Sequence, residues 1–304
     1  MTGFLFSHFL YLTIMNFNNQ NLKVCNIHHA DLDGAGSNIV LKNFYKTVYS
    51  IPVTYTTEWK LLEELKPYKD RIETIICTDF YPEKTINDLR KICPVLVIDH
   101  HESVQDYNND NDIIINPTYS GTKLVYMFIN KFKDIKYLNE LVEIIDDYDM
   151  FRLKNPKSKY FNMMFWEMGC KWFIRRFING NVNLYPEEKQ YFKDALNEFN
   201  EMYENMEICD LARKGVFFEV SKYHTECIDA LKKEGYKWFI IKNKSALSVR
   251  CDDIDLTEVC KKIGFGGGHK SAVGFPLKKT DNVGDIIKKI EYYVDELYMN
   301  SIDD

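Results

Sequence analysis

Short apolar segments alternate with helical segments from about residue 22 to about residue 151, and this alternation restricts the fold more than any other feature. Such a pattern is typical of a parallel β-sheet that is covered by helices on both faces. We expect strands at residues 23–27, 48–53, 72–78, 95–99 and 113–115. Helices are expected to begin after Gly34, near Trp59, at Lys84 and at Thr122, where Ser120 and Gly121 resemble a helix cap.

Three of these strands run directly into acidic and histidine residues. The first leads into His29-Ala30-Asp31-Leu32-Asp33-Gly34, the third into Asp79, and the fourth into Asp99-His100-His101. Ligands of open parallel sheets bind beyond the carboxyl ends of the strands, so we expect these side chains to meet at one edge. Aspartate and neutral histidine bind Mn²⁺, Mg²⁺ and related ions. Each motif alone is a common turn or a structural pair, but together they predict a metal site.

Two metal ions held close together can activate a water and neutralise the charge that develops on a phosphate during in-line displacement. The strand-end motifs therefore favour hydrolysis of a phosphate ester. A second motif, Gly266-Gly267-Gly268-His269, allows the backbone to approach a ligand closely, and its imidazole can donate to a phosphate or stack on a base. Without the metal motifs, a tight turn would explain this glycine run equally well.

The remainder of the chain divides into a helical stretch and a second α/β region. Aromatic-rich helical periodicity extends from about residue 151 to about residue 212. Beyond it we expect strands at residues 215–220, 238–241, 246–250 and 272–277, and helices at 224–235, 256–263 and 283–299. The predicted fold class is α/β, with a parallel-sheet domain, a helical connector and a smaller C-terminal α/β domain. The predicted boundaries are an extension at 1–21, a metal-binding domain at 22–151, the connector at 152–212 and a substrate-binding domain at 213–304.

Composition excludes several classes of protein. With 304 residues, of which 45% are hydrophobic, the chain can bury a core in each of two domains. A formal charge of -6 argues against a broad basic surface for long duplex nucleic acid. The eight cysteines form no C-x-x-C pair, which favours a reducing cytoplasm over a zinc ribbon or a disulfide scaffold. Residues 4–14 are apolar but too few to span a bilayer, so no membrane partner is expected, and Met15 is an alternative start to Met1.

These motifs, in this order, resemble the DHH phosphoesterase superfamily, in the branch that carries a C-terminal DHH-associated domain. The matching residues are His29, Asp31-Leu32-Asp33-Gly34, Asp79, Asp99-His100-His101, Asp146-Asp147-Tyr148-Asp149, and Gly266-Gly267-Gly268-His269 with Ala272 and Gly274. Within the superfamily the chain is most similar to the B-type nanoRNases, oligoribonucleases that are grouped with cyclic-nucleotide phosphodiesterases. The resemblance implies a two-metal hydrolase, usually Mn²⁺-dependent with Mg²⁺ or Co²⁺ as alternatives. It also implies an active-site cleft between two α/β domains.

The resemblance also assigns roles to particular residues. The implied metal ligands are His29, Asp31, Asp33, Asp79, His100 and Asp149, with Asp79 as the bridge between two ions. His101 would contact the scissile phosphate or protonate the departing oxygen, and Asp99 would orient the imidazoles. The implied substrate-binding residues are Arg250, Gly266, Gly267, Gly268 and His269.

Two of these assignments stay open. Asp146 shares a helical face with Asp149 and is the alternative ligand. The spacing from His29 to Asp31 is shorter than in the pyrophosphatases and A-type nanoRNases, so His29 is either a ligand or a close neighbour of the ions.

The leading function is hydrolysis of short oligonucleotides, such as nanoRNA and linear dinucleotides, to mononucleotides. The alternatives are a phosphodiesterase for cyclic mono- or dinucleotides, a RecJ-like single-strand exonuclease, and a nucleotide sensor without activity. The expected partner is a short oligonucleotide or a small nucleotide diester. The sequence leaves open the substrate length, RNA or DNA preference, cleavage polarity, physiological metal, biological role and oligomeric state, a homodimer included.

Overall fold

The structure is a computed structural model that describes residues 17–55, 57–109 and 112–300 of the chain. It contains two compact units, Met1–Asn183 and Leu184–Asp304, which we call the N-terminal and the C-terminal unit. The boundary between them falls inside the predicted helical connector, and most of the predicted extension at 1–21 lies outside the described residues. The four-part division therefore stays a prediction.

The N-terminal unit is built on a five-stranded sheet in which all pairs are parallel. Its strands follow the order β2-β1-β3-β4-β5. They span β1 (Lys23–His29), β2 (Thr47–Val53), β3 (Thr74–Thr78), β4 (Val95–Asp99) and β5 (Ile113–Ile115). His28 pairs with Thr78, and Thr78 pairs with Ile98, so β1, β3 and β4 end side by side. The predicted parallel sheet is confirmed, and its register brings the strand-end motifs to one edge.

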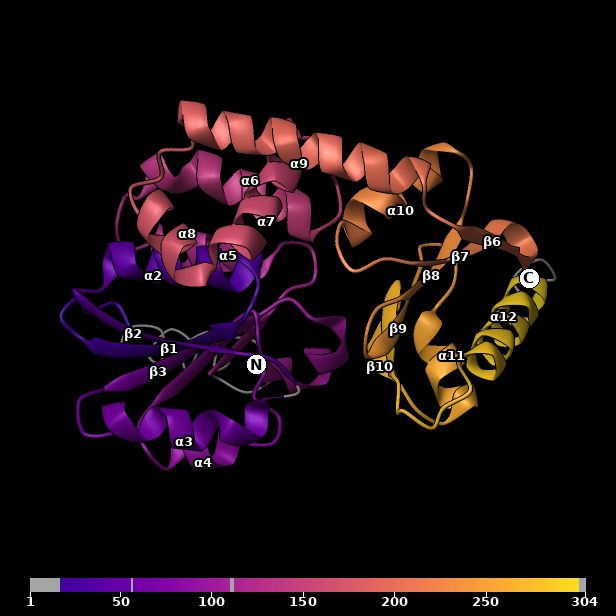
Figure 1. Cartoon of the computed structure of the whole chain (residues 1–304). Helices are drawn as coiled ribbons and strands as arrows, with labels where there is room; N and C mark the ends of the chain where they lie inside the picture. Colours follow the sequence, from indigo (N-terminus) through magenta and orange to yellow (C-terminus); the bar gives the residue numbers. More distant parts are fainter. Residues whose placement is uncertain (1–16, 56, 110–111, 301–304) are drawn as a thin grey trace. The chain divides into compact units, whose positions relative to one another are not determined.

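Helices cover both faces of this sheet (Figure 1). They are α2 (Leu32–Phe44), α3 (Leu61–Leu65), α4 (Ile86–Arg90), α5 (Gly121–Ile129), α6 (Asn139–Asp149), α7 (Pro156–Met168) and α8 (Cys170–Phe177). Alternate strand residues such as Ile27 and Cys77 pack with Leu61 and Leu89 from α3 and α4. On the other face, α2 contacts β1 and also packs against α5 and α8. β3 and β4 are buried throughout, which explains their continuous apolar sequence.

Helix α2 begins at Leu32, although the sequence predicted a start after Gly34. The reason is the cap: the Asp31 carboxylate accepts a hydrogen bond from the Gly34 amide at 3.0 Å, so the chain turns into the helix at once. The first acidic motif therefore forms the opening turn of a helix. The predicted cap of α5 is present, since the Ser120 hydroxyl accepts from the Lys123 amide.

The C-terminal unit is a smaller α/β fold, as predicted, and its sheet is mixed. Its strands are β6 (Ile208–Leu211), β7 (Gly215–Glu219), β8 (Trp238–Lys242), β9 (Ala246–Cys251), β10 (Gly267–His269) and β11 (Ala272–Pro276), in the order β10-β11-β9-β8-β7-β6. Its helices are α9 (Pro186–Glu204), α10 (His224–Lys233), α11 (Leu256–Ile263) and α12 (Val283–Asn300). The sequence assigned β6 to the helical connector and β10 to a loop. Both assignments were wrong, because β6 is a largely exposed edge strand and β10 consists mostly of glycine.

The two faces of the C-terminal sheet carry different cores. Trp238 and Ile240 pack in one cluster with residues of α11 and α12, and Phe239 and Ile241 pack in another with residues of α9 and α10. Arg250 pairs with Phe239 across the sheet and so lies on the α10 face. Within the part of the chain that the structure describes, no helix combines the length and the apolar character that crossing a membrane requires.

Candidate metal centre

The opening turn of α2 holds the first two carboxylates of the site. Asp31 caps the helix, while Asp33 is 1% exposed and accepts hydrogen bonds from the amides of Gly121, at 2.6 Å, and Thr122, at 2.9 Å. Those amides belong to the first turn of α5, so Asp33 ties two helices together. Gly34 is required here, because a Cβ at this position would lie 2.0 Å from the His29 carbonyl oxygen.

Asp79 follows β3 directly and adopts a φ of 54°, in the left-handed region that residues other than glycine rarely occupy. Strain of this kind persists where the surrounding structure enforces it, and it is concentrated at functional sites. Gly121 forms part of that surrounding structure. A Cβ on Gly121 would lie 2.7 Å from the Asp79 Cβ and 2.8 Å from Asp33 Oδ2. The helix cap predicted at this position thus also makes room for two carboxylates.

His100 faces three carboxylates with one ring nitrogen. Its Nε2 lies 3.2 Å from Asp79 Oδ1, 3.4 Å from Asp149 Oδ2 and 3.9 Å from Asp33 Oδ2. Asp149 reaches this position because it is the last residue of α6. The side chains gathered here come from the α2 start, the ends of β3 and β4, and the α6 end.

The potential ligand atoms form three overlapping groups, and the atoms in each group lie within 4.8 Å of one another. The groups are His29 with Asp31 and Asp79, then Asp33 with His100 and Asp149, and finally Asp79 with Asp99, His100 and His101. Asp79 and His100 each belong to two groups. The predicted ligands on different elements are therefore brought together at one sheet edge.

Two of the imidazoles are held by carboxylates. His29 Nδ1 lies 2.5 Å from Asp31 Oδ2 and 4.0 Å from Asp79 Oδ2. His101 Nδ1 lies 2.6 Å from Asp99 Oδ1, which also accepts the His100 backbone amide at 2.7 Å. If Nδ1 of His101 carries the proton and donates it to Asp99, then Nε2 is the atom that can act on a ligand. Asp99 is fully buried, so it fixes the orientation of the two histidines.

The pKa values around the cluster separate into two sets. Burial, together with neighbouring carboxylates, raises the pKa of Asp33, Asp79 and Asp149. Burial alone would also raise the pKa of Asp31 and Asp99, but the adjacent imidazoles of His29 and His101 outweigh it and lower both.

The pKa of His100 moves the other way from what its burial predicts. Burial lowers it, but the carboxylates of Asp149 and Asp33 outweigh burial and raise it. The site thus concentrates more negative charge than its histidines neutralise.

The donor set fits divalent metal ions. Asp79 Oδ2 and Asp149 Oδ2 are buried and accept no hydrogen bond among the described residues. A buried carboxylate oxygen without a partner is costly, and a cation removes that cost. Carboxylate oxygens mixed with imidazole nitrogens suit Mn²⁺, Mg²⁺ and related ions. This acidic and histidine cluster could bind metal.

Asp146, the alternative to Asp149, has other partners. Its Oδ1 accepts the Ser120 amide at 2.8 Å, and its Oδ2 pairs with the Arg152 guanidinium. These contacts link α6 to the cap of α5 and to the segment after α6. In the geometry of the described residues, Asp149 and not Asp146 joins a group that could hold an ion.

The predicted substrate-binding residues lie in the C-terminal unit. Arg250 donates to the Ser248 hydroxyl at 2.6 Å. The glycines 266, 267 and 268 are exposed. Gly268 must be glycine, because its φ is 147° and a Cβ there would lie 2.3 Å from the Ala272 carbonyl oxygen. His269 ends β10 by its backbone, but its side chain lies outside the described part of the structure.

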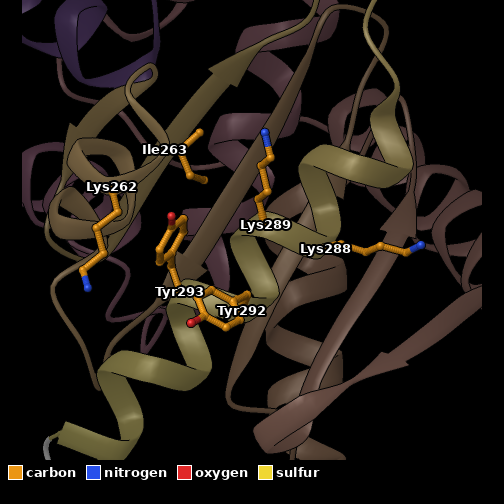
Figure 2. Close-up of a pocket in the computed structure, with 6 residues that line it drawn as sticks. All are labelled: Lys262, Ile263, Lys288, Lys289, Tyr292 and Tyr293. Atoms are coloured by element: carbon orange, nitrogen blue, oxygen red, sulfur yellow. The ribbon is translucent and has the colours of Figure 1, made fainter.

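A pocket of about 240 Å³ occurs on the opposite side of the C-terminal sheet. It is lined by Lys262, Ile263, Lys288, Lys289, Tyr292 and Tyr293, and Figure 2 shows Tyr293 between Lys262 and Lys289. Ile263 and Tyr293 pack on the core beneath α11 and α12, whereas Arg250 lies on the α10 face. The pocket therefore contains none of the predicted substrate-binding residues.

One residue near the cluster was missed by the sequence reasoning. Tyr55 follows β2, and the centre of its ring lies 5.6 Å from that of His29 and 5.8 Å from that of His101. No motif marks this tyrosine. The signal that could have found it is its position just beyond a predicted strand, at the edge where the other motifs lie.

The fold and the cluster together define an α/β protein with a candidate site for divalent metal ions at the carboxyl edge of a parallel sheet. Residues 23–148 match the DHH family, N-terminal domain. The N-terminal unit therefore carries a DHH-family domain, and the chain fits the DHH phosphoesterase superfamily. A search of curated protein sequences gives no significant match.

Solved structures with the same fold come from several proteins. The DHH domain of a protein described as a member of a family of ribosomal proteins matches with 11% identity and a TM-score of 0.63, over 95% of this chain and 90% of that one. The pGpG-specific phosphodiesterase PggH from Vibrio cholerae matches with 15% identity and a TM-score of 0.56, over 90% and 100%. RecJ from Thermus thermophilus, in complex with Mn²⁺, matches with 12% identity and a TM-score of 0.60, over 95% and 55%. At these identities the likeness concerns the fold, which is that of a DHH-family phosphoesterase.

Proposed function

We propose that this protein is a phosphodiesterase that hydrolyses linear dinucleotides and other short oligonucleotides to mononucleotides with two divalent ions, Mn²⁺ foremost. The observation that carries the proposal is the position of Asp79. Its carboxylate shares one group with His29 and Asp31 and lies 3.2 Å from His100, which shares another group with Asp33 and Asp149. A carboxylate between two ligand sets is what a pair of ions needs as a bridge.

In this proposal the ligands divide between the two ions. His29 and Asp31 would hold one ion, Asp33, His100 and Asp149 would hold the other, and Asp79 would serve both. When bound, the ions would supply an activated water and neutralise the charge that develops on the phosphate. Burial and the repulsion of neighbouring carboxylates raise the pKa of Asp79 and Asp149, and two cations would offset both effects, which supports ion binding at this cluster.

His101 and Asp99 act on the substrate side of the reaction. The Asp99 carboxylate holds His101 by Nδ1, and Nε2 is the atom that would contact the scissile phosphate or give a proton to the departing oxygen. The buried carboxylate stabilises the imidazole ring whenever it is positively charged. Arg250, the three glycines 266–268 and His269 would bind the nucleotide, since a guanidinium and exposed backbone amides suit phosphates.

A small substrate is favoured over a long strand by two observations. The chain has a net charge of -6, which disfavours tracking a long polyanion. The likeness in fold to a protein whose name specifies pGpG extends over the whole of that protein.

All eight cysteines, which lie in the described residues, are free, and this supports a reducing compartment such as the cytoplasm.

The test is a substrate panel assayed with the full-length chain and Mn²⁺. The panel contains a linear diribonucleotide, a cyclic dinucleotide, a cyclic mononucleotide, and single-stranded RNA and DNA of about twenty nucleotides, with products separated by chromatography. We expect the fastest release of mononucleotides from the linear dinucleotide, abolished by a chelator. Preference for the long strands would replace the proposal with a RecJ-like exonuclease, and binding without turnover would replace it with a sensor.

A further inference from the structure

Tyr55 presents a flat apolar surface directly beside the candidate metal centre. Its ring packs against Phe80, with ring centres 5.2 Å apart, and it lies near the imidazoles of His29 and His101. Phe80 is fully buried, whereas 44% of Tyr55 is exposed to solvent. One side of the ring is therefore fixed by the protein, and the remainder stays available to a ligand.

Two residues near Tyr55 in the chain are hydrogen-bonded to each other. The Thr57 hydroxyl accepts the Thr54 amide at 2.9 Å, and the Thr57 amide donates to the Thr54 carbonyl oxygen at 2.9 Å. The Tyr55 ring itself packs against the buried Phe80 ring. A ring that already packs against a buried side chain loses little conformational freedom when a ligand binds to it, which favours a binding role.

Besides Phe80, the rings next to Tyr55 are the imidazoles of His29 and His101, which belong to the groups that could hold metal ions and, with them, a phosphate. A phosphodiester at the cluster carries a nucleoside on each side. We propose that Tyr55 is the stacking surface for the nucleobase next to the scissile phosphate, so that this site selects phosphodiesters that bear a base. Aromatic rings stack on any base, so the subsite favours nucleotides without fixing their sequence. This inference rests on the proposed function, because it places the substrate phosphate at the metal centre.

The experiment compares two substrates that differ only in their bases. One is a linear 5′-phosphorylated diadenosine ribonucleotide, and the other is the same molecule with both bases replaced by hydrogen. We expect Tyr55→Ala to lower kcat/KM for the adenosine substrate about 5- to 150-fold, the equivalent of about 1–3 kcal/mol per stacked base. The same variant should leave kcat/KM for the abasic substrate unchanged, and Tyr55→Phe and Tyr55→Trp should retain activity on both.

A matched control is Tyr137→Ala, which removes another exposed tyrosine of the N-terminal unit. Tyr137 donates to Asn43, near the far end of α2, about 15 Å of helix away from Asp33. Equal losses on both substrates in Tyr55→Ala would overturn the proposal, because they would indicate a packing role toward His29 and His101. Unchanged kcat/KM on the adenosine substrate would overturn it as well.

Failure of the proposed function is distinguishable from failure of this inference. If the wild-type chain hydrolyses no substrate, the proposed function fails, but the dinucleotide then survives and its binding can be titrated. A dinucleotide containing 2-aminopurine reports stacking by quenched fluorescence. Weaker binding and lost quenching in Tyr55→Ala, but not in Tyr55→Phe, support the subsite, and unchanged quenching refutes it.

Discussion

The charged side chains described in the two units differ in their exposure to solvent. At the edge of the N-terminal sheet, Asp33, Asp79 and Asp99 are 0–2% exposed and lie among histidines. In the C-terminal unit, ion pairs such as Lys242 with Glu219 and Lys232 with Asp252 lie at the surface. Exposed pairs of this kind contribute about 0–1 kcal/mol each and have little effect on the fold. Buried carboxylates in excess are costly, so the contrast indicates where the molecule requires a ligand.

The contrast also predicts how ligand binding affects the activity and the stability of each unit. The repulsion at the N-terminal edge is part of the folded structure, so a cation there changes both activity and stability. The glycine loop of the C-terminal unit has no buried carboxylates. A change in this loop should therefore affect ligand binding but not stability. Variants of each unit can test that difference, starting with the largest expected effect.

Removing the shared carboxylate should have the largest consequence. We expect Asp79→Ala to lower kcat about 10³-fold or more, because both ions lose a ligand and the charge that develops on the phosphate is no longer neutralised. The fold should stay intact, since the substitution also removes a source of repulsion. Mononucleotide release and circular dichroism measure the two effects.

The control for this variant is Asp70→Ala, which removes an exposed carboxylate after α3. It should leave kcat unchanged. Full activity in Asp79→Ala would show that this carboxylate does not hold the ions.

The next effect concerns the residue that orients His101. We expect Asp99→Asn to lower kcat about 10- to 100-fold, as removal of a residue that positions an active histidine usually does. KM and the affinity for Mn²⁺ should change little, because Asp99 is proposed to act through the imidazole. Isothermal titration with Mn²⁺ and steady-state kinetics separate these quantities. A large loss of Mn²⁺ affinity would instead make Asp99 a ligand.

Substitution of Gly121 should have a smaller effect on activity, because it disturbs packing and removes no ligand. A Cβ on Gly121 would lie 2.7 Å from the Asp79 Cβ, so Gly121→Ala should cost about 1–3 kcal/mol of unfolding free energy and reduce activity. Gly284→Ala in the C-terminal unit is the matched control, because its Cβ would meet its nearest neighbour at 3.5 Å. Urea titration measures both variants, and equal stabilities would contradict the packing of Gly121 against the cluster.

The pH dependence of stability should also differ between the metal-free and the loaded protein. Burial raises the pKa of Asp33, Asp79 and Asp149, so the folded state holds their protons more tightly than the unfolded chain does. Metal-free stability should therefore fall as the pH rises above about 4, the ordinary pKa of aspartate. His100, with its raised pKa, contributes in the same direction above about 6.5.

Thermal denaturation between pH 5 and pH 8 tests this dependence, with the range fixed by those ordinary values. Adding Mn²⁺ should restore stability at the upper end, and metal-free Asp79→Asn should lose less stability than the wild type. Asp31 and Asp99, whose pKa values are lowered, stabilise the fold above about 4, and this contribution is lost only on acidification. A Tm that is independent of pH without metal would contradict the charge excess described for the cluster.

Most of the candidate site could be predicted from the residues at the strand ends. Buried parallel strands have continuous apolar sequences, so β3 and β4 and the residues after them could be found. The cap formed by Asp31 was not foreseen, because the sequence shows the residue types but not which amide a carboxylate accepts. Asp149 and Asp146 could not be separated, since both lie on one helical face and only their tertiary partners differ.

The features that the sequence could not predict are those that lack a local pattern or depend on neighbours in space. β6 has an exposed edge and β10 has glycines, so neither carries the apolar alternation that marks a strand. Gly121 and Tyr55 matter because of what lies beside them in space. Neither the clash at Gly121 nor the ring contacts of Tyr55 can be read from spacing along the chain.

The smallest expected effect tests the glycine loop, where the C-terminal unit should respond differently from the metal centre. A Cβ on Gly267 meets no atom within 4 Å, so Gly267→Ala should change the unfolding free energy by no more than about 0.5 kcal/mol. The added methyl would nevertheless stand where the backbone is proposed to approach the nucleotide, so KM for a dinucleotide should rise a few-fold with kcat and Mn²⁺ affinity unchanged. Gly264→Ala does not serve as a control because its φ is 86°, but Gly284→Ala does, because its Cβ would meet its nearest neighbour at 3.5 Å and it lies in α12, outside the loop. If Gly267→Ala changes the Mn²⁺ requirement as Asp79→Ala does, then the two units do not divide metal binding and substrate binding between them.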